Sequence, residues 1–191
     1  MGATHRLLGA AAGVVWAGSQ HLGPGQTVVG VAVAVLTSAG GTSPDVDQSW
    51  AWRRTGRVLP ARAFGHGGPM RHRGLSHWWG LPAGAALWLA AAAPGWSWVA
   101  AAALVGWGSH LLGDLVFGRH DVRSARGPGI PLAPWWGHVG LGLDVGGTLE
   151  RLVMQRLALP LALAWLTLDH LGLAHPLWQR VSQAVVSARH G

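Results

Sequence analysis

Two long stretches without a charged residue constrain this chain more than any other feature of its sequence. Positions 7–44 hold no Asp, Glu, Lys or Arg over 38 residues, and positions 74–113 hold none over 40. A turn signal interrupts each run once, at Gly23-Pro24-Gly25 and at Pro94-Gly95. Each run therefore predicts a helical hairpin, and an arm of about 18 residues rises about 27 Å, close to the hydrocarbon thickness of a bilayer.

The composition agrees with a membrane environment and excludes several kinds of site. Half of the 191 residues are hydrophobic and 11% are charged, whereas a soluble domain averages about 25%. The chain has no cysteine, which excludes disulfides, thiolate metal sites and cysteine nucleophiles. Its formal net charge is +7, with 14 arginines, no lysine and 7 acidic residues. Because the basic residues flank apolar runs, they favour anionic lipid over nucleic acid as a partner.

Twelve arginines lie next to the predicted arms, and two hairpins would place all of them on one side of the membrane. The positive-inside rule makes that side cytoplasmic. The two turn signals carry no Lys or Arg, as the outer side requires. The twelve are Arg6, Arg53, Arg54, Arg57, Arg62, Arg71, Arg73, Arg119, Arg123, Arg126, Arg151 and Arg156.

The C-terminal part adds one more apolar segment, at 157–173, which predicts a last membrane helix before an interfacial tail at 176–191. Residues 127–150, rich in Gly and Pro, predict a loop or a partly inserted segment. The sequence thus predicts an all-α, multi-pass integral membrane protein with a single domain over 1–191, built from two transmembrane helical hairpins and a fifth apolar helix. Two alternatives stay open: a soluble protein with a buried hairpin core, and a signal peptide at 1–18.

Histidine and aspartate gather where the predicted arms meet the cytoplasmic side. Because the arms are antiparallel, these residues should converge at one membrane face, although they are distant in sequence. Histidine and carboxylate ligands without cysteine suit Zn²⁺, Mn²⁺ or Fe²⁺, as one ion or as two about 3.5–4 Å apart. A bound metal would lower the pKa of water and produce a nucleophile. The converging residues are His5, Asp45, Asp47, His72, His77, His110 and Asp114.

The pair His110 and Asp114 is the strongest part of this cluster, because its spacing of four residues puts both on one helix face. We expect the metal ligands to be His5, Asp45, His77, His110 and Asp114. Asp47, His72 and Arg73 are the expected catalytic residues, with Arg73 clamping a phosphate or carboxylate.

Each of these positions also has a plainer interpretation. His5 can be an interfacial residue, Asp45 a turn or cap, and Arg73 a positive-inside anchor. Ser76 is expected to be the N-cap of the third arm. Glu150, the only glutamate, can support the site as a base or simply start a helix.

The order of these motifs resembles a family of bacterial inner-membrane metal-dependent hydrolases linked by name to LexA and the DNA-damage response. The resemblance covers about residues 1–150. It departs from the family pattern at Gly127-Pro128-Gly129, at Ser76 and at Trp136, none of which is an expected ligand. The motifs that carry it are Thr4-His5, Ser43-Pro44-Asp45-Val46-Asp47, His72-Arg73-Gly74-Leu75-Ser76-His77, Gly108-Ser109-His110-Leu111-Leu112-Gly113-Asp114 and the segment 127–136.

The resemblance implies a membrane-bound hydrolase of the bacterial inner membrane whose metal site faces the cytoplasm. A looser likeness to zinc-dependent phospholipase C favours a phosphoester or lipid substrate in or near the bilayer. A metal-independent lipid phosphatase is disfavoured, since the chain lacks both lysine and a Pro-Ser-Gly-His motif. The remaining alternative is a non-enzymatic adaptor or regulator whose cluster binds a structural metal. Membrane lipid is the expected partner, and nucleic acid is not.

Overall fold

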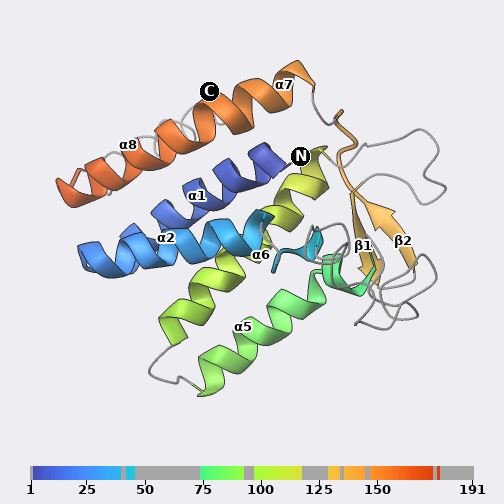
Figure 1. Ribbon diagram of the computed structural model, residues 1–191, viewed down its shortest axis with the longest axis horizontal. Coiled ribbons are helices and arrows are strands. Elements are labelled where there is room, and N and C mark those ends of the chain that lie inside the picture. The colour runs from blue at the N-terminus through green and yellow to red at the C-terminus, as the bar shows by residue number, and fades with distance from the viewer. Residues whose placement is uncertain are drawn as a thin grey trace, which may run out of the picture.

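The computed structural model describes residues 2–39, 42–45, 74–92, 97–117, 129–133, 136–144, 147–173 and 176. The described residues are mostly helical, with one short two-stranded sheet (Figure 1). In chain order the elements are α1 (Gly2–Ser19), α2 (Pro24–Ala39), the 3-10 helix η2 (Leu75–His77), α5 (Gly80–Ala92), α6 (Ser97–Phe117), β1 (Ile130–Ala133), β2 (Trp136–Val139), α7 (Thr148–Glu150), the π-helix η3 (Arg151–Leu157) and α8 (Ala158–His170).

The helices occupy the predicted apolar arms, with different bounds at three places. α1 begins at Gly2, five residues before the charge-free run starts at Leu7, because no helix breaker separates the two. α5 has only 13 residues and α6 has 21, so the second hairpin is unequal. The last apolar helix begins at Thr148 rather than at 157, and runs through α7 and η3 into α8.

Small residues let α1, α2 and α6 approach one another closely. A Cβ added at Gly9 would lie 2.6 Å from the Cβ of Ser38, and one added at Gly13 would lie 3.0 Å from the Cβ of Ala34. Gly106 of α6 fits against the same Ala34, with 2.7 Å between an added Cβ and the Ala34 Cα. Close backbone approach through small residues is the usual packing mode of helices in lipid.

Two of the described helices are long and apolar enough to cross a membrane, namely α6 and the continuous helix Thr148–His170. α2 and α5 are shorter apolar helices. The outer faces of these helices carry large apolar side chains, with Leu87 74% exposed on α5 and Leu161 64% exposed on α8. Apolar surface of this extent is unusual for a soluble monomer and is suited to contact with lipid.

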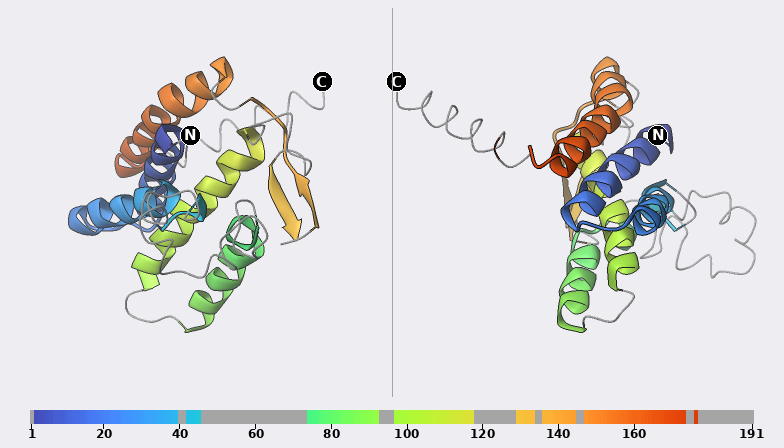
Figure 2. Two further views of the ribbon diagram at one scale, coloured as in Figure 1. Left: turned by 45° about the vertical axis from the view of Figure 1, so that its right-hand side comes forward. Right: turned by 90° about the vertical axis from the view of Figure 1, so that its left-hand side faces the viewer.

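The short sheet corrects the prediction of an all-α fold. β1 and β2 form an antiparallel hairpin with Ile130 opposite Val139, inside the segment expected to be a loop. The chain after β2 then caps α6: the Leu141 N–H donates to the Leu115 carbonyl (2.8 Å). The helix-end carbonyls of α6 thereby gain the partners that they lack within the helix. Figure 2 shows the hairpin beside the C-terminal end of α6.

Candidate metal centre

Five of the predicted site residues come together in one cluster, in which four are buried and Asp45 is partly exposed. His5 comes from α1, Asp45 from the turn after α2, His77 from the end of η2, and His110 and Asp114 from the last turns of α6. His77 and His110 are fully buried, and Asp114 is 2% exposed. Fully buried polar side chains in so apolar a chain are costly unless they have a partner.

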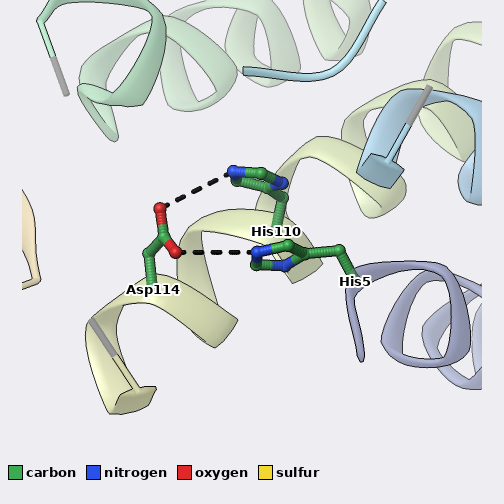
Figure 3. Close-up of side chains that lie close together, drawn as sticks. All are labelled: His5, His110 and Asp114. Atoms are coloured by element: carbon green, nitrogen blue, oxygen red, sulfur yellow. Dashed lines mark ion pairs between the residues drawn. The ribbon is translucent and has the colours of Figure 1, made fainter. Parts of the chain in front are cut away.

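The carboxylate of Asp114 lies at the middle of the cluster. Its Oδ1 lies 3.6 Å from Nε2 of His5, and its Oδ2 lies 3.6 Å from Nε2 of His110 (Figure 3). The same Oδ2 lies 3.4 Å from Nε2 of His77. Asp45 Oδ1 closes the cluster on the other side, 3.3 Å from His77 Nε2 and 3.8 Å from His110 Nε2.

The local sequence of α6 explains how His5 reaches this carboxylate. His110 and Asp114 are one turn apart on the face that packs against α1. Between them, Gly113 leaves room for the His5 ring, since a Cβ there would lie 3.1 Å from two of its atoms. A larger residue at this position would push α1 away from α6, and with it His5 from Asp114.

Ser38 orients the His110 ring and contacts the backbone of His5, a role that no sequence pattern predicts. The His110 Nδ1 lies 2.6 Å from the Ser38 carbonyl, so this nitrogen donates its proton there and Nε2 points into the cluster. The Ser38 hydroxyl donates to the His5 carbonyl at 2.7 Å, and the Ser109 hydroxyl contacts Ser38 Oγ at 3.1 Å. A serine within an apolar helix has no sequence signal for this role, because the contact with His110 is made by the backbone carbonyl of Ser38.

The third histidine is also held through its Nδ1. The Ser76 hydroxyl lies 3.1 Å from His77 Nδ1, and the Trp107 indole donates to the Ser76 carbonyl at 3.0 Å. Ser76 therefore lies within η2 and not at the predicted N-cap of the third arm, since α5 begins only at Gly80. Its hydroxyl orients a histidine instead of capping a helix.

The arrangement of donors fits a divalent cation. Nε2 of His110 and Nδ1 of His5 are buried and have no hydrogen-bond partner within the described part of the chain. Two groups, His5–His110–Asp114 and Asp45–His77–His110, each bring one ligand atom per residue within 4.8 Å of the others. Imidazole and carboxylate ligands are those that Zn²⁺ and Mn²⁺ accept.

The three predicted catalytic residues, Asp47, His72 and Arg73, lie outside the described residues. Glu150 is 3% exposed at the end of α7. His170 is exposed at the far end of α8.

A cavity of about 560 Å³ lies elsewhere, between α5, α6 and the end of α1. Trp16, Leu89, Trp98 and Val105 are among the residues that line it, and none of the five clustered residues does. On α6 it occupies the N-terminal half, whereas His110 and Asp114 lie in the C-terminal half. The cluster is therefore a separate site.

The fold and the cluster together define a helical, membrane-type protein with a buried centre of histidine and aspartate. Within that class, the chain belongs to the YdjM inner membrane protein family, whose sequence profile matches residues 1–169. This match confirms that the chain belongs to an inner-membrane protein family, and it extends past the expected limit near residue 150. It carries no statement about hydrolysis or DNA damage, so both stay predictions. No curated protein and no solved structure matches the chain.

Proposed function

We propose that this protein is a metal-dependent hydrolase of the inner membrane that acts on a phosphoester or lipid substrate at the cytoplasmic face. One observation carries the proposal: five histidine and aspartate side chains, four of them buried, converge from four separate segments with ligand spacing. Such convergence costs free energy of folding, because polar groups must leave water, and binding a cation offsets that cost.

The metal is proposed to be Zn²⁺ or Mn²⁺, held within the set His5, Asp45, His77, His110 and Asp114. A divalent cation supplies Lewis-acid chemistry, which polarises a phosphoryl or carbonyl oxygen and makes water nucleophilic at neutral pH. The protein's own contribution is to fix the ligands. Ser38 and Ser76 orient two imidazoles through Nδ1, so that Nε2 of each faces the cluster.

The proposed catalytic residues follow or precede the cluster closely in sequence. Asp47 is two residues after Asp45, while His72 and Arg73 come shortly before His77. We assign the binding of an anionic phosphoryl group to Arg73, whose guanidinium fork suits paired oxygens. Asp47 and His72 are assigned the proton transfers around the attacking water.

The proposed topology has both hairpins and the last helix crossing the bilayer, with the cluster at the cytoplasmic side. Since the chain has no cysteine, single cysteines report on topology without background labelling. Thr42→Cys lies near the cluster and Gln20→Cys lies at the opposite end of the first hairpin, and both positions are exposed. In intact cells a membrane-impermeant maleimide should label Gln20→Cys alone, and the reverse pattern would overturn the proposed orientation.

Metal content of the detergent-purified protein is the first test of the proposed site. The wild type should contain one or two equivalents of Zn or Mn, and His110→Ala/Asp114→Ala should contain none. Asp169→Ala/His170→Ala is a matched control, since it removes the same residue types from α8. α8 packs through Leu166 at Gly18, about 20 Å along α1 from His5. If the wild type contains no metal after purification without chelator and with metal supplied, the proposal is wrong.

Turnover separates the hydrolase from a non-enzymatic adaptor with a structural metal. The protein in vesicles of phosphatidylglycerol and phosphatidic acid should release water-soluble product, which is measured with and without added Zn²⁺ or Mn²⁺. Loss of turnover in His110→Ala or Asp114→Asn, with unchanged helix content, is the expected result. A metal-loaded wild type without turnover on any phosphoester or lipid ester would favour the adaptor.

A further inference from the structure

The five clustered residues do not have equal roles, and their ring geometry separates them. We infer that the cluster holds a single ion, bound by Asp45, His77, His110 and Asp114, and that His5 is a positioning residue that acts through Asp114. Water or substrate would enter as a fifth ligand during turnover, an expansion that catalytic zinc sites permit. This inference rests on the proposed metal site and assigns its stoichiometry and its ligands.

Four of the six donor–donor distances in this set are close to the edges of a tetrahedron around one ion. With metal–ligand bonds of about 2.1 Å, neighbouring ligand atoms of a tetrahedral site lie about 3.4 Å apart. His77 Nε2 lies 3.3 Å from Asp45 Oδ1 and 3.4 Å from Asp114 Oδ2. The corresponding distances from His110 Nε2 are 3.8 and 3.6 Å. These four edges therefore need only small adjustments to enclose an ion.

The two imidazoles of this set also face each other as ligands of one ion should. An imidazole lone pair lies in the ring plane, so two rings bound to one tetrahedral ion have centroids about 5.2 Å apart. The rings of His77 and His110 have centroids 5.3 Å apart and an interplanar angle of 65°. Both lone pairs can therefore meet at one point.

His5 has the opposite relation to His110. Their rings are stacked, with centroids 4.0 Å apart and planes 20° from parallel. An ion in the plane of the His110 ring would lie well outside the plane of the His5 ring, where His5 has no lone pair to offer. Hence His5 and His110 cannot bind the same ion in this arrangement.

A second ion bound by His5 is also disfavoured. The group His5–His110–Asp114 would have to hold it, but His110 already binds the first ion. The His110 Nδ1 is occupied by the Ser38 carbonyl at 2.6 Å, which leaves only Nε2 for a metal. One imidazole nitrogen binds one ion. His5 would then have only one carboxylate oxygen, Asp114 Oδ1, as a co-ligand among the residues of that group.

The remaining role of His5 is to hold Asp114. It faces Oδ1 at 3.6 Å, while Oδ2 faces His77 and His110. At this distance the two atoms are in polar contact without a full hydrogen bond. An N–H group beside one oxygen of a carboxylate favours one direction for the other oxygen, as outer groups do around metal ligands. The stacking on His110 and the close fit at Gly113 keep the His5 ring in this place.

The test compares glutamine with alanine at position 5, using stoichiometry and the absorption spectrum of the Co²⁺-substituted protein. Glutamine can place an N–H donor near Asp114 Oδ1 but is a poor metal ligand. His5→Gln should retain one equivalent and an unchanged four-coordinate Co²⁺ spectrum, whereas His5→Ala should bind about 10–100-fold more weakly. His77→Gln and His110→Gln should lose the metal, and the exposed control His170→Gln should not.

Three results are informative against this assignment. If His5→Gln empties the site as His110→Gln does, or lowers the coordination number seen by Co²⁺, His5 is a ligand. If the wild type binds two equivalents and His5→Gln removes one, the centre is dinuclear. A wild type without metal would instead refute the proposed function itself, which keeps the two failures distinct.

Discussion

Replacing Gly106 with alanine tests whether the cluster depends on the close approach of α2 and α6. A Cβ at this position would overlap the Ala34 carbonyl and the Thr37 hydroxyl, and would lie 2.7 Å from the Ala34 Cα. Restoring ordinary contact separates the helices by roughly 1 Å, enough to lose up to half of the dispersion attraction of the affected atom pairs. Ser38, whose carbonyl accepts from His110, moves away with α2.

The expected magnitude follows from three terms. Alanine gains about 1 kcal/mol of helix propensity over glycine. Overpacking costs about 1–3 kcal/mol, and weakening the bond between His110 and Ser38 costs about 1 kcal/mol more. Gly106→Ala should therefore lower the free energy of unfolding by about 1–3 kcal/mol. It should also lower the metal content, because Ser38 and Asp45 both depend on the position of α2.

Gly108 provides the matched control two residues further along α6. No atom lies within 4 Å of a Cβ added there, so Gly108→Ala keeps only the propensity gain of up to about 1 kcal/mol. Unfolding by SDS titration in mixed micelles, followed by circular dichroism, measures both variants. Equal stability and equal metal content of the two would refute the packing argument.

Three further changes have outcomes set by the structure. Leu161→Arg, near the middle of the last apolar helix, should raise the free energy of membrane insertion by about 3 kcal/mol in a translocon-insertion reporter, and Leu161→Phe should not. Trp78→Phe loses the indole bond to a β1 carbonyl (3.0 Å) and should speed amide exchange in the hairpin about fivefold, whereas exposed Trp79→Phe should leave it unchanged. With free metal at 100 times Kd, the bound ion should stabilise the wild type, so removing it with chelator should lower the free energy of unfolding by about 3 kcal/mol. Chelator should have no effect on the stability of His110→Ala/Asp114→Ala.

The convergence of the five clustered residues could be predicted from the sequence, because it depends only on the order and direction of the predicted arms. Charge-free runs with one turn each make antiparallel arms, and residues at the ends of antiparallel arms meet. His110 and Asp114 follow from helix periodicity alone. Asp45 and His77 follow from their place beside apolar arms, even though η2 separates His77 from α5. Such arguments place residues at one end of a bundle without specifying their orientation.

The parts that the sequence did not predict depend on backbone groups and on tertiary contact. The β1–β2 hairpin forms in a Gly- and Pro-rich segment with little periodicity, and its tie to α6 is a backbone bond between Leu141 and Leu115. The orientation of His110 is set by the Ser38 carbonyl, which every residue type possesses. The stacking of His5 on His110 requires the angle between α1 and α6, which no local pattern encodes.

The balance of charge in the cluster gives an independent reason to expect a cation. Within the described residues, Asp114 pairs only with imidazoles, and its side chain is 3% exposed. A buried carboxylate requires a compensating positive charge or a proton, since desolvating it alone costs several kcal/mol. A divalent cation supplies that charge at the point where Nε2 of His77 and His110 face Asp114 Oδ2.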